Sequence, residues 1–423
     1  MTSIRKPIRP VLTLLTCCSG LLSGAAEWGE ITLDTRLRFE SAEQDGKGDA
    51  DNTSLRLRPG FTTKAVQGFQ AMVEGEFTVP FDKNSYNAAG VHGDPQKAVI
   101  ADPENAQLEQ AWLGYSAEQL SLKVGRQVIA LDDHRWIGHV GWRQNRQTYD
   151  AVSVTAKPVK SVTVRLGYID NVVRIFGEDA PASGANAGEF GSESTFANLS
   201  YAAGAWGTLT GFGYFLDLDD APGKIAGSDT LGVRYTGSYK GVEGMPLGIN
   251  LSYANQSDAG GNVQDYSADY LLGELSTTWK GLSLQAGFER LGSDAAGPDA
   301  EGNPTYASVK SPLATLHKFN GFADVFLVTP DKGLEDTYVM AGYTFPLTEE
   351  LGPLVTKIWY HDFSTDAGGE DLGSEIDVVV AKPIPLQIPG AMVFLFKYAD
   401  FQAEGDGTDV NRLSAELNYT LTF

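Results

Sequence analysis

Cysteine, positive charge and long apolar runs are all scarce in this sequence. The two cysteines, Cys17 and Cys18, lie near the start of the 423-residue chain. The formal net charge is −22, which argues against a nucleic-acid partner, because binding phosphates needs positive charge. Beyond residue 26 nothing approaches the run of about 20 apolar residues that a membrane-spanning helix needs. A nucleic-acid-binding protein and a helical membrane protein are therefore both disfavoured.

The first residues have the pattern of a secretory signal. A positively charged start is followed by the short apolar stretch 11–22 and by small residues at positions 24–26. This order is typical of a signal peptide that is cleaved after export. We therefore predict a signal peptide over residues 1–26 and one domain over residues 27–423. Both cysteines lie in the removed part, so the mature chain is expected to have neither a disulfide nor a thiolate metal site.

What the sequence has in abundance is strict alternation of apolar and polar residues. Successive side chains of a strand point to opposite faces, so alternation gives a strand one apolar and one polar face. No comparable stretch shows a helical period. The clearest alternating segments are residues 28–40, 53–65, 70–77, 162–168, 282–289 and 412–423.

Short and long connections alternate between these segments. That asymmetry is typical of outer-membrane barrels, which have short periplasmic turns and long extracellular loops. We predict an all-β fold, a transmembrane antiparallel β-barrel of about 18 strands, with 16 as the alternative count. The apolar faces would contact lipid and the polar faces would line an aqueous lumen. A periplasmic β-protein with a dry core is disfavoured, because its inward polar groups would lack partners.

The end of the chain indicates the compartment. Phe423 closes an alternating strand, and an aromatic end of this kind resembles the signal that the barrel-assembly machinery reads in bacterial outer-membrane barrels. We expect a multi-pass protein of the outer membrane of a Gram-negative bacterium. Its expected partners are outer-membrane lipids, lipopolysaccharide and the assembly machinery.

Two segments carry a family resemblance. Residues 124–150 contain Gly-Arg-Gln at a strand end, then Arg-x-Ile-Gly, Gly-Trp-x-Gln-Asn and an aromatic-Asp strand start. Residues 317–326 add a second block, His-Lys-Phe-Asn-Gly-Phe-Ala-Asp-Val-Phe. These two sequence blocks are similar to those of the alginate-export family of outer-membrane porins. The resemblance implies an 18-strand barrel with a narrow lumen and, in the family's exporters, an arginine-rich lumen that passes an anionic polysaccharide.

Charged residues on the polar faces are the candidates for solute contact. The arginines of the first, second and last strands should lie together, because the terminal strands pair when a barrel closes. We expect them to form one basic wall, although Asp34, Glu40, Glu289 and Glu416 are also predicted to point inward. The predicted lumen-lining and anion-contacting residues are Arg36, Arg38, Arg56, Arg58, Arg126, Arg135, Arg143, Arg146, Arg165, Arg234, Arg412, Lys123, Glu74 and Glu76.

Two connections are candidates for a constriction. Residues 125–150 break the alternation and concentrate arginine and aspartate, as expected of a loop that folds into the pore and contacts anions. The alternative is a structural loop whose charges satisfy one another. Residues 317–326, within the long connection 292–333, could form a plug or constriction, and the alternative is a loop that packs against the inner wall for stability. Trp142 is expected in the core of the first loop. The constriction candidates are Asp132, Asp133, His317, Lys318 and Asp324.

The predicted function is a passive channel for hydrophilic, anionic or sugar-like solutes, with polysaccharide export as one form of it. One alternative is an outer-membrane enzyme with an active site at the rim. Asp132, Asp133 and His134 would be its candidates, but no Gly-x-Ser-x-Gly element accompanies them, so no catalytic residue is assigned. The other alternative is a sealed structural barrel.

No cofactor is predicted. The five histidines lack the spacing of a metal site. The acidic segments 49–52 and 217–220 have the oxygen ligands that Ca²⁺ prefers, but neither matches a full binding-loop signature. Solvated surface is the preferred interpretation of both.

Overall fold

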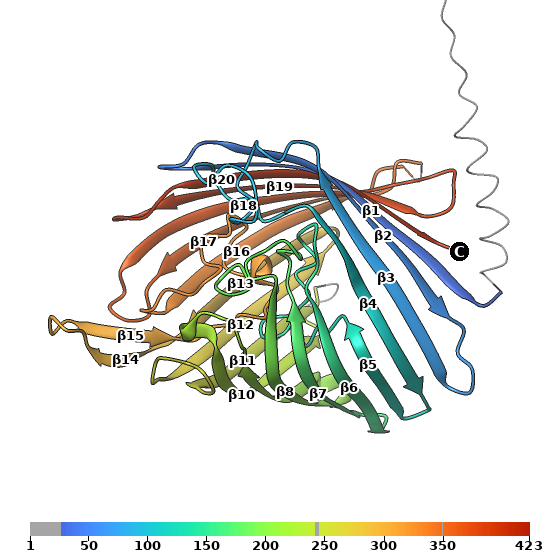
Figure 1. The fold of residues 1–423 in the computed structure, drawn as a ribbon, viewed down its shortest axis with the longest axis horizontal. Coiled ribbons are helices and arrows are strands. Elements are labelled where there is room, and N and C mark those ends of the chain that lie inside the picture. The colour runs from blue at the N-terminus through green and yellow to red at the C-terminus, as the bar shows by residue number, and fades with distance from the viewer. Residues whose placement is uncertain (1–26, 242–244, 349) are drawn as a thin grey trace, which may run out of the picture.

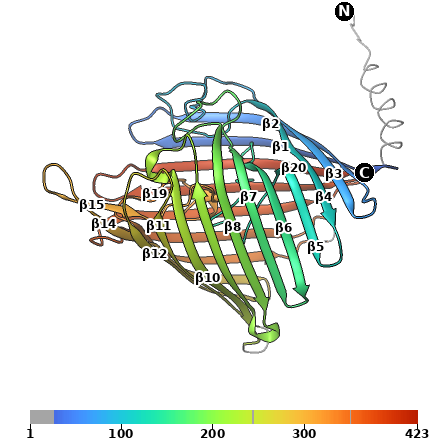
Figure 2. The same cartoon turned by 60° about the horizontal axis from the view of Figure 1, so that its bottom comes forward.

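Eighteen antiparallel strands form one closed sheet in the computed structural model (Figures 1 and 2). The structure describes residues 27–241, 245–348 and 350–423. The predicted signal peptide, residues 1–26, lies outside the described residues. No helix among the described residues is long and apolar enough to cross a membrane.

The elements follow in chain order. The barrel strands are β1 (Gly29–Gln44), β2 (Ala50–Thr63), β3 (Phe69–Pro80), β4 (Asn105–Ser116), β5 (Leu120–Gln127), β6 (Thr148–Val159), β7 (Val162–Val173), β8 (Glu189–Ala202), β9 (Thr208–Asp217), β10 (Gly227–Tyr239), β11 (Leu247–Asp258), β12 (Ser267–Trp279), β13 (Leu282–Leu291), β16 (Leu334–Phe345), β17 (Leu354–Ser364), β18 (Asp371–Ile384), β19 (Ala391–Ala403) and β20 (Val410–Thr422). A separate hairpin consists of β14 (Ser293–Pro298) and β15 (Pro304–Ser308). The short 3-10 helices are η1 (Gly204–Trp206), η2 (Gly223–Ile225) and η3 (Leu316–Lys318).

Closure of the sheet removes every free edge in the barrel. Each strand pairs with its neighbours in the chain, β13 pairs with β16 across the hairpin, and β1 pairs with β20. The backbone of Phe423 continues this last pairing, since its N–H donates to the Ile31 carbonyl at 2.9 Å. The prediction of 18 strands is confirmed, and the alternative of 16 is wrong. Open edges would leave backbone groups without partners in lipid, which closure avoids.

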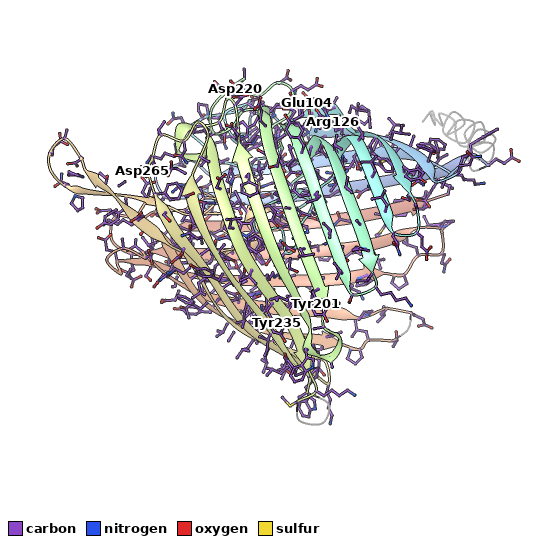
Figure 3. The ribbon with its side chains drawn as sticks, turned by 90° about the horizontal axis from the view of Figure 1, so that it is seen from below. Glu104, Arg126, Tyr201, Asp220, Tyr235 and Asp265 are labelled. Carbon is purple, nitrogen blue, oxygen red and sulfur yellow. The ribbon has the colours of Figure 1, made fainter. Side chains whose placement is uncertain are left out.

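The two faces of the wall differ as the alternation predicts. On β1, Leu37 and Phe39 are exposed on the outside, whereas Arg38 and Glu40 are buried on the inside. The outer surface is therefore apolar and suited to lipid. Tyr201 and Tyr235 lie at the end of the barrel that carries the short turns, where aromatic side chains anchor a barrel at the membrane interface (Figure 3).

Two long connections fill much of the interior. Loop A (residues 128–147) joins β5 to β6, and loop B (residues 309–333) joins β15 to β16. Trp136 and Ile137 of loop A belong to a buried apolar cluster with Tyr214 and Tyr270 of the wall. This packing explains why the alternation stops in loop A, where most side chains are buried or half-buried against other parts of the protein.

Loops A and B also bind each other. The Gly138 N–H donates to the Leu313 carbonyl at 2.8 Å, and the Thr315 N–H donates to the His134 carbonyl at 3.0 Å. Ile137 and Leu313 form a parallel β-bridge. The two loops therefore act as one unit that narrows the lumen.

Candidate functional site: the narrowed lumen

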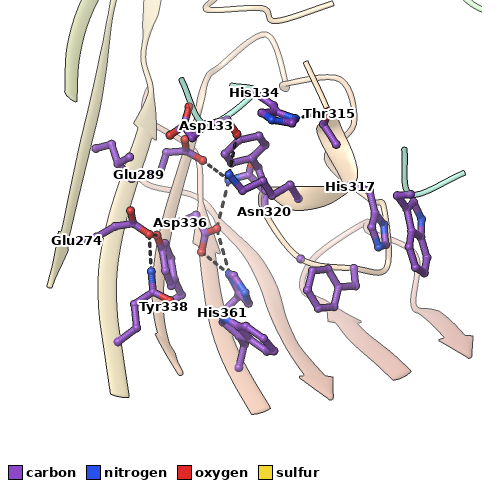
Figure 4. A pocket seen from close by; sticks show the side chains of 18 of the residues that line it. Asp133, His134, Glu274, Glu289, Thr315, His317, Asn320, Asp336, Tyr338 and His361 are labelled. Atoms are coloured by element: carbon purple, nitrogen blue, oxygen red, sulfur yellow. Dashed lines mark hydrogen bonds and ion pairs between the residues drawn. The ribbon is translucent and has the colours of Figure 1, made fainter. Parts of the chain in front are cut away.

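The main cavity considered below lies between the two loops and the wall (Figure 4). Its volume is about 620 Å³. Loop A, loop B and strands from β10 to β19 all contribute side chains. Among the residues that line it are Asp133, His134, Trp142, Arg234, Glu274, His317, Lys318, Phe322, Asp336, Tyr338, Trp359, His361 and Lys397.

Glu274 is held on the wall by neutral donors. It accepts hydrogen bonds from the Tyr338 hydroxyl at 2.6 Å, from the Gln285 amide at 2.5 Å and from the Asn250 amide. Three fixed donors orient this carboxylate and occupy much of its accepting capacity. Its negative charge remains in the cavity.

A second chain of hydrogen bonds connects loop B to the wall (Figure 4). The Asn320 amide donates to Glu289 at 2.9 Å and to Asp336 at 3.2 Å. Asp336 lies 2.9 Å from Nδ1 of His361. These contacts bind the tip of loop B to β13 and β16, and they link β16 to β17.

Trp142 is surrounded by cationic and aromatic groups. The His317 ring stacks on it at 3.9 Å with an interplanar angle of 1°. The Arg38 guanidinium lies 4.0 Å from the centroid of the indole, and the Lys397 ammonium lies 3.6 Å from it. Trp142 thus lines the cavity and carries two cation–π contacts, instead of serving only as loop core.

His317 and Asp324 form a buried pair beneath this stack. Nδ1 of His317 lies 2.7 Å from Asp324, which also receives a hydrogen bond from Arg143 at 2.7 Å. Burial, followed by the nearby Lys397 ammonium, lowers the pKa of His317 to about 3, so the imidazole is neutral at pH 7. Burial alone would raise the pKa of Asp324, but His317 and Arg143 outweigh it and hold that pKa below its usual range.

The five arginines of β1, β2 and β20 do lie on adjacent strands. They do not form a free basic wall, because each one contacts a carboxylate of the same wall. Buried charges are costly unless they are paired, and mixing the two signs satisfies both. The pairs are Arg36–Glu416 at 3.4 Å, Arg38–Glu40 at 2.5 Å, Arg38–Glu416 at 3.2 Å, Arg56–Asp34, Arg58–Glu76 at 2.5 Å and Arg412–Glu40 at 3.3 Å.

The arginines of loop A attach the loop to the wall. Their partners lie on β1, β3, β4 and β13, so loop A is fixed along much of its length. This arrangement favours the structural interpretation of these arginines over direct solute contact. The pairs are Arg135–Glu289 at 3.0 Å, Arg143–Glu40 at 3.0 Å, Arg146–Glu109 at 2.7 Å and Arg146–Glu74.

The two neighbouring aspartates of loop A have different roles. Asp132 accepts hydrogen bonds from the Tyr214 hydroxyl at 2.7 Å and the Asn198 amide at 3.0 Å, and so anchors the loop. Asp133 lines the cavity and pairs with Arg234 at 3.2 Å. The Lys318 ammonium donates to the Asp133 carbonyl at 2.6 Å.

The prediction that Arg126 lines the lumen is wrong. Strand β5 continues to Gln127, so Arg126 shares the outward face of Val124, which is exposed. Arg126 pairs with Asp150 of β6 at 2.8 Å and lies at the rim of the barrel (Figure 3). The glycine at 125 concealed that the strand and its alternation continue through this segment.

Lys123 and Arg165 line a smaller cavity of about 180 Å³ below loop A. The Lys123 ammonium lies 4.3 Å from the Trp112 ring centroid. Within the described parts of the chain, neither cation forms an ion pair. They differ in this respect from the arginines of β1, β2 and β20.

The residues predicted from the sequence do not include Lys397, Glu274 or the Asp336–His361 pair. Lys397 is a charged residue in the largely apolar strand 391–403, on the same face as Ala399 and Phe401. A charge on the inward face of an apolar strand is a sequence signal for a lumen-lining residue. No group of three or more metal-binding side chains occurs in the part of the chain that the structure describes.

The comparisons with known proteins agree with this geometry. The alginate export family matches residues 27–303, about two thirds of the chain. The chain belongs to the alginate export family. It is an outer-membrane porin-type channel for solutes, and its wall contacts the lipids of that membrane. No curated protein matches the sequence.

Solved porins share the fold at low sequence identity. OccAB4 of Acinetobacter baumannii is 16% identical with a TM-score of 0.68, over 94% of this chain and 98% of that chain. The outer-membrane protein OpdK of Pseudomonas aeruginosa is 14% identical with a TM-score of 0.68, over 94% and 99%. A structure of OpdK with vanillate is 15% identical with a TM-score of 0.66, over 93% and 99%.

Proposed function

We propose that this member of the alginate export family is a passive channel for small hydrophilic solutes that carry negative charge. The observation behind the proposal is an imbalance among the charges of the lumen. Lys318 and Lys397 line the main cavity, and Lys123 and Arg165 line the smaller one. Among the residues that the structure describes, none of these four cations has a carboxylate partner, whereas the inward carboxylates discussed above are held by fixed donors. The free cations are therefore the exchangeable contacts for an anion.

Two further observations support small anions over a polymer. Loops A and B are bound to each other and to the wall, so they restrict the width of the lumen. The similar porin OpdK has been solved with vanillate, which is a carboxylate. Export of an anionic polysaccharide, suggested by the family's description, is the second candidate function. It would require the loops to move aside.

The test is the ion selectivity of the purified full-length chain in planar bilayers under a salt gradient. We expect the sign of the reversal potential to show that the channel passes anions in preference to cations. Replacing both Lys123 and Arg165 with glutamine should shift that potential toward zero, because two fixed positive charges are removed from the lumen. The matched control is Lys160→Gln, an exposed charge in the turn between β6 and β7.

Other outcomes would count against the proposal. A cation-selective wild-type channel would overturn it. A chain that inserts but conducts no current would favour a sealed barrel, or an enzyme if hydrolysis were found instead. Transport of alginate oligomers at the same rate as small carboxylates would favour the export function.

A further inference from the structure

The Lys397 ammonium has an unusual environment for a charged group. It extends from β19 into the main cavity, 3.6 Å from the Trp142 ring centroid and 4.3 Å from that of Phe322. Across the described residues no carboxylate lies within ion-pair distance of it. Aromatic faces stabilise the positive charge, but they leave its hydrogen-bonding capacity unused.

One hydrogen bond sets the direction of this ammonium. Lys397 Nζ lies 2.9 Å from Nε2 of His317, and Nδ1 of the same ring lies 2.7 Å from Asp324. The proton of the neutral imidazole belongs on Nδ1, facing the carboxylate, so Nε2 accepts from Lys397. Arg143 fixes Asp324 in turn, at 2.7 Å.

The remaining donors of the ammonium are free. An ammonium has three N–H groups, and one of them is used by His317. No other described residue accepts a hydrogen bond from Lys397. The cavity beside it is where an acceptor from outside the protein would fit.

We propose that Lys397 binds the carboxylate of a small, singly charged solute in this cavity, and that His317 and Asp324 are positioning residues that aim its ammonium. This inference rests on the proposed function, because it assumes that anions enter the lumen. Lys397 would then determine which anions are retained in the cavity.

The charges of the cavity favour a single negative charge on the solute. Glu274 and Asp336 line the same cavity as Lys397. Their carboxylates repel a second negative charge, whereas one carboxylate is compensated by the ammonium. The other cation of this cavity without a carboxylate partner among the described residues, Lys318, already donates to the Asp133 carbonyl at 2.6 Å. A monoanion such as gluconate should therefore bind more tightly than the dianion sulfate.

The experiment measures the affinity of gluconate from the concentration at which it interrupts the current of single full-length channels. In the wild type, gluconate should bind more tightly than sulfate. Lys397→Gln should weaken gluconate binding about tenfold, since it removes a charged hydrogen-bond donor. The matched control is Lys357→Gln, because Lys357 faces the lumen from β17 but does not line the cavity.

Two variants of His317 separate positioning from mere packing. In His317→Gln the amide oxygen reaches the place of Nε2 and can still accept from Lys397, so affinity should stay within about twofold of the wild type. In His317→Asn that acceptor is lost, and affinity should fall about fivefold. Circular dichroism of every variant verifies that the barrel has folded.

The outcomes separate the two proposals. Equal gluconate affinity in the wild type and in Lys397→Gln would overturn the inference, and so would tighter binding of sulfate than of gluconate. An anion-selective wild type with either result leaves the proposed function intact. A cation-selective wild type overturns the proposed function itself.

Discussion

Charged residues inside this barrel mostly hold the protein together. Arg38 contacts Glu40, Asp102 and Glu416, and its guanidinium also donates to the Trp142 carbonyl at 2.7 Å. Removing one partner from such a group leaves a buried charge without compensation, which commonly costs about 3–5 kcal/mol. Among the described residues of the lumen, the cations without a carboxylate partner, Lys397 above all, are therefore exceptions that need a functional explanation.

Acidification is expected to release loop B at His317. The ordinary pKa of histidine is 6.5, and the docked His317 has a pKa of about 3. Between these two pKa values, His317 binds more protons when loop B is released than when it is docked. The docked loop is therefore most stable above about pH 6.5, and its stability decreases as the pH falls. The groups facing this imidazole are Trp142 and Arg143 of loop A, Asp324 of loop B and Lys397 of β19.

The measurement is hydrogen–deuterium exchange of loop B from about pH 7.5 to about pH 4, corrected for the intrinsic exchange rate. Loop opening should rise by up to about tenfold per pH unit. His317→Phe keeps a ring against Trp142 but cannot take up a proton, so its profile should be nearly flat. The control is His92→Phe, which lies in a different loop. A wild-type profile without pH dependence would contradict the prediction.

At the scale of elements, the sequence predicts the wall well and the loops poorly. Lipid on one side and water on the other impose a two-residue period, so the strands and most inward side chains could be inferred. The loop contacts could not, because Arg143 and Asp324 are 181 residues apart and nothing local marks them as partners. The side of the wall on which Arg126 lies was predicted wrongly for a related reason, since no residue in the sequence marks where β5 ends.

The junction of the two loops depends on a glycine. A Cβ atom on Gly138 would lie 2.3 Å from the Thr315 hydroxyl and 2.8 Å from Cβ of His134. Gly138→Ala should therefore push loop B away, at a cost of about 1–3 kcal/mol. Exchange protection of both loops should fall together. Gly211→Ala is the matched control, because its Cβ would meet nothing within 4 Å. Protection equal to the wild type in Gly138→Ala would refute the dependence.

At the scale of the whole molecule, the strands and the loops have separate tasks. The closed hydrogen-bonded ladder gives a stable cylinder, and an 18-strand barrel is wide enough for an aqueous lumen. The loops reduce that width to the cavity described above. Conductance should thus be set by the loops, and barrel stability by the wall.

Shortening loop A tests this division. Removal of residues 133–141 should raise single-channel conductance at least about twofold, since the narrowest part of an 18-strand lumen would be widened. The barrel should still fold, which circular dichroism can verify. Removal of residues 296–303, the tip of hairpin β14–β15, should leave conductance unchanged. An unaltered conductance after loop A is shortened would place the constriction elsewhere.

The hairpin β14–β15 has a practical consequence. It projects from the barrel at the end opposite the C-terminus (Figure 1), and Asp299, Glu301 and Asn303 at its tip bond mainly within the tip itself. In an outer-membrane barrel the long connections face the surroundings of the cell. A foreign peptide inserted between Glu301 and Gly302 would therefore be displayed to antibodies or immobilised targets, on a support that takes no part in conduction.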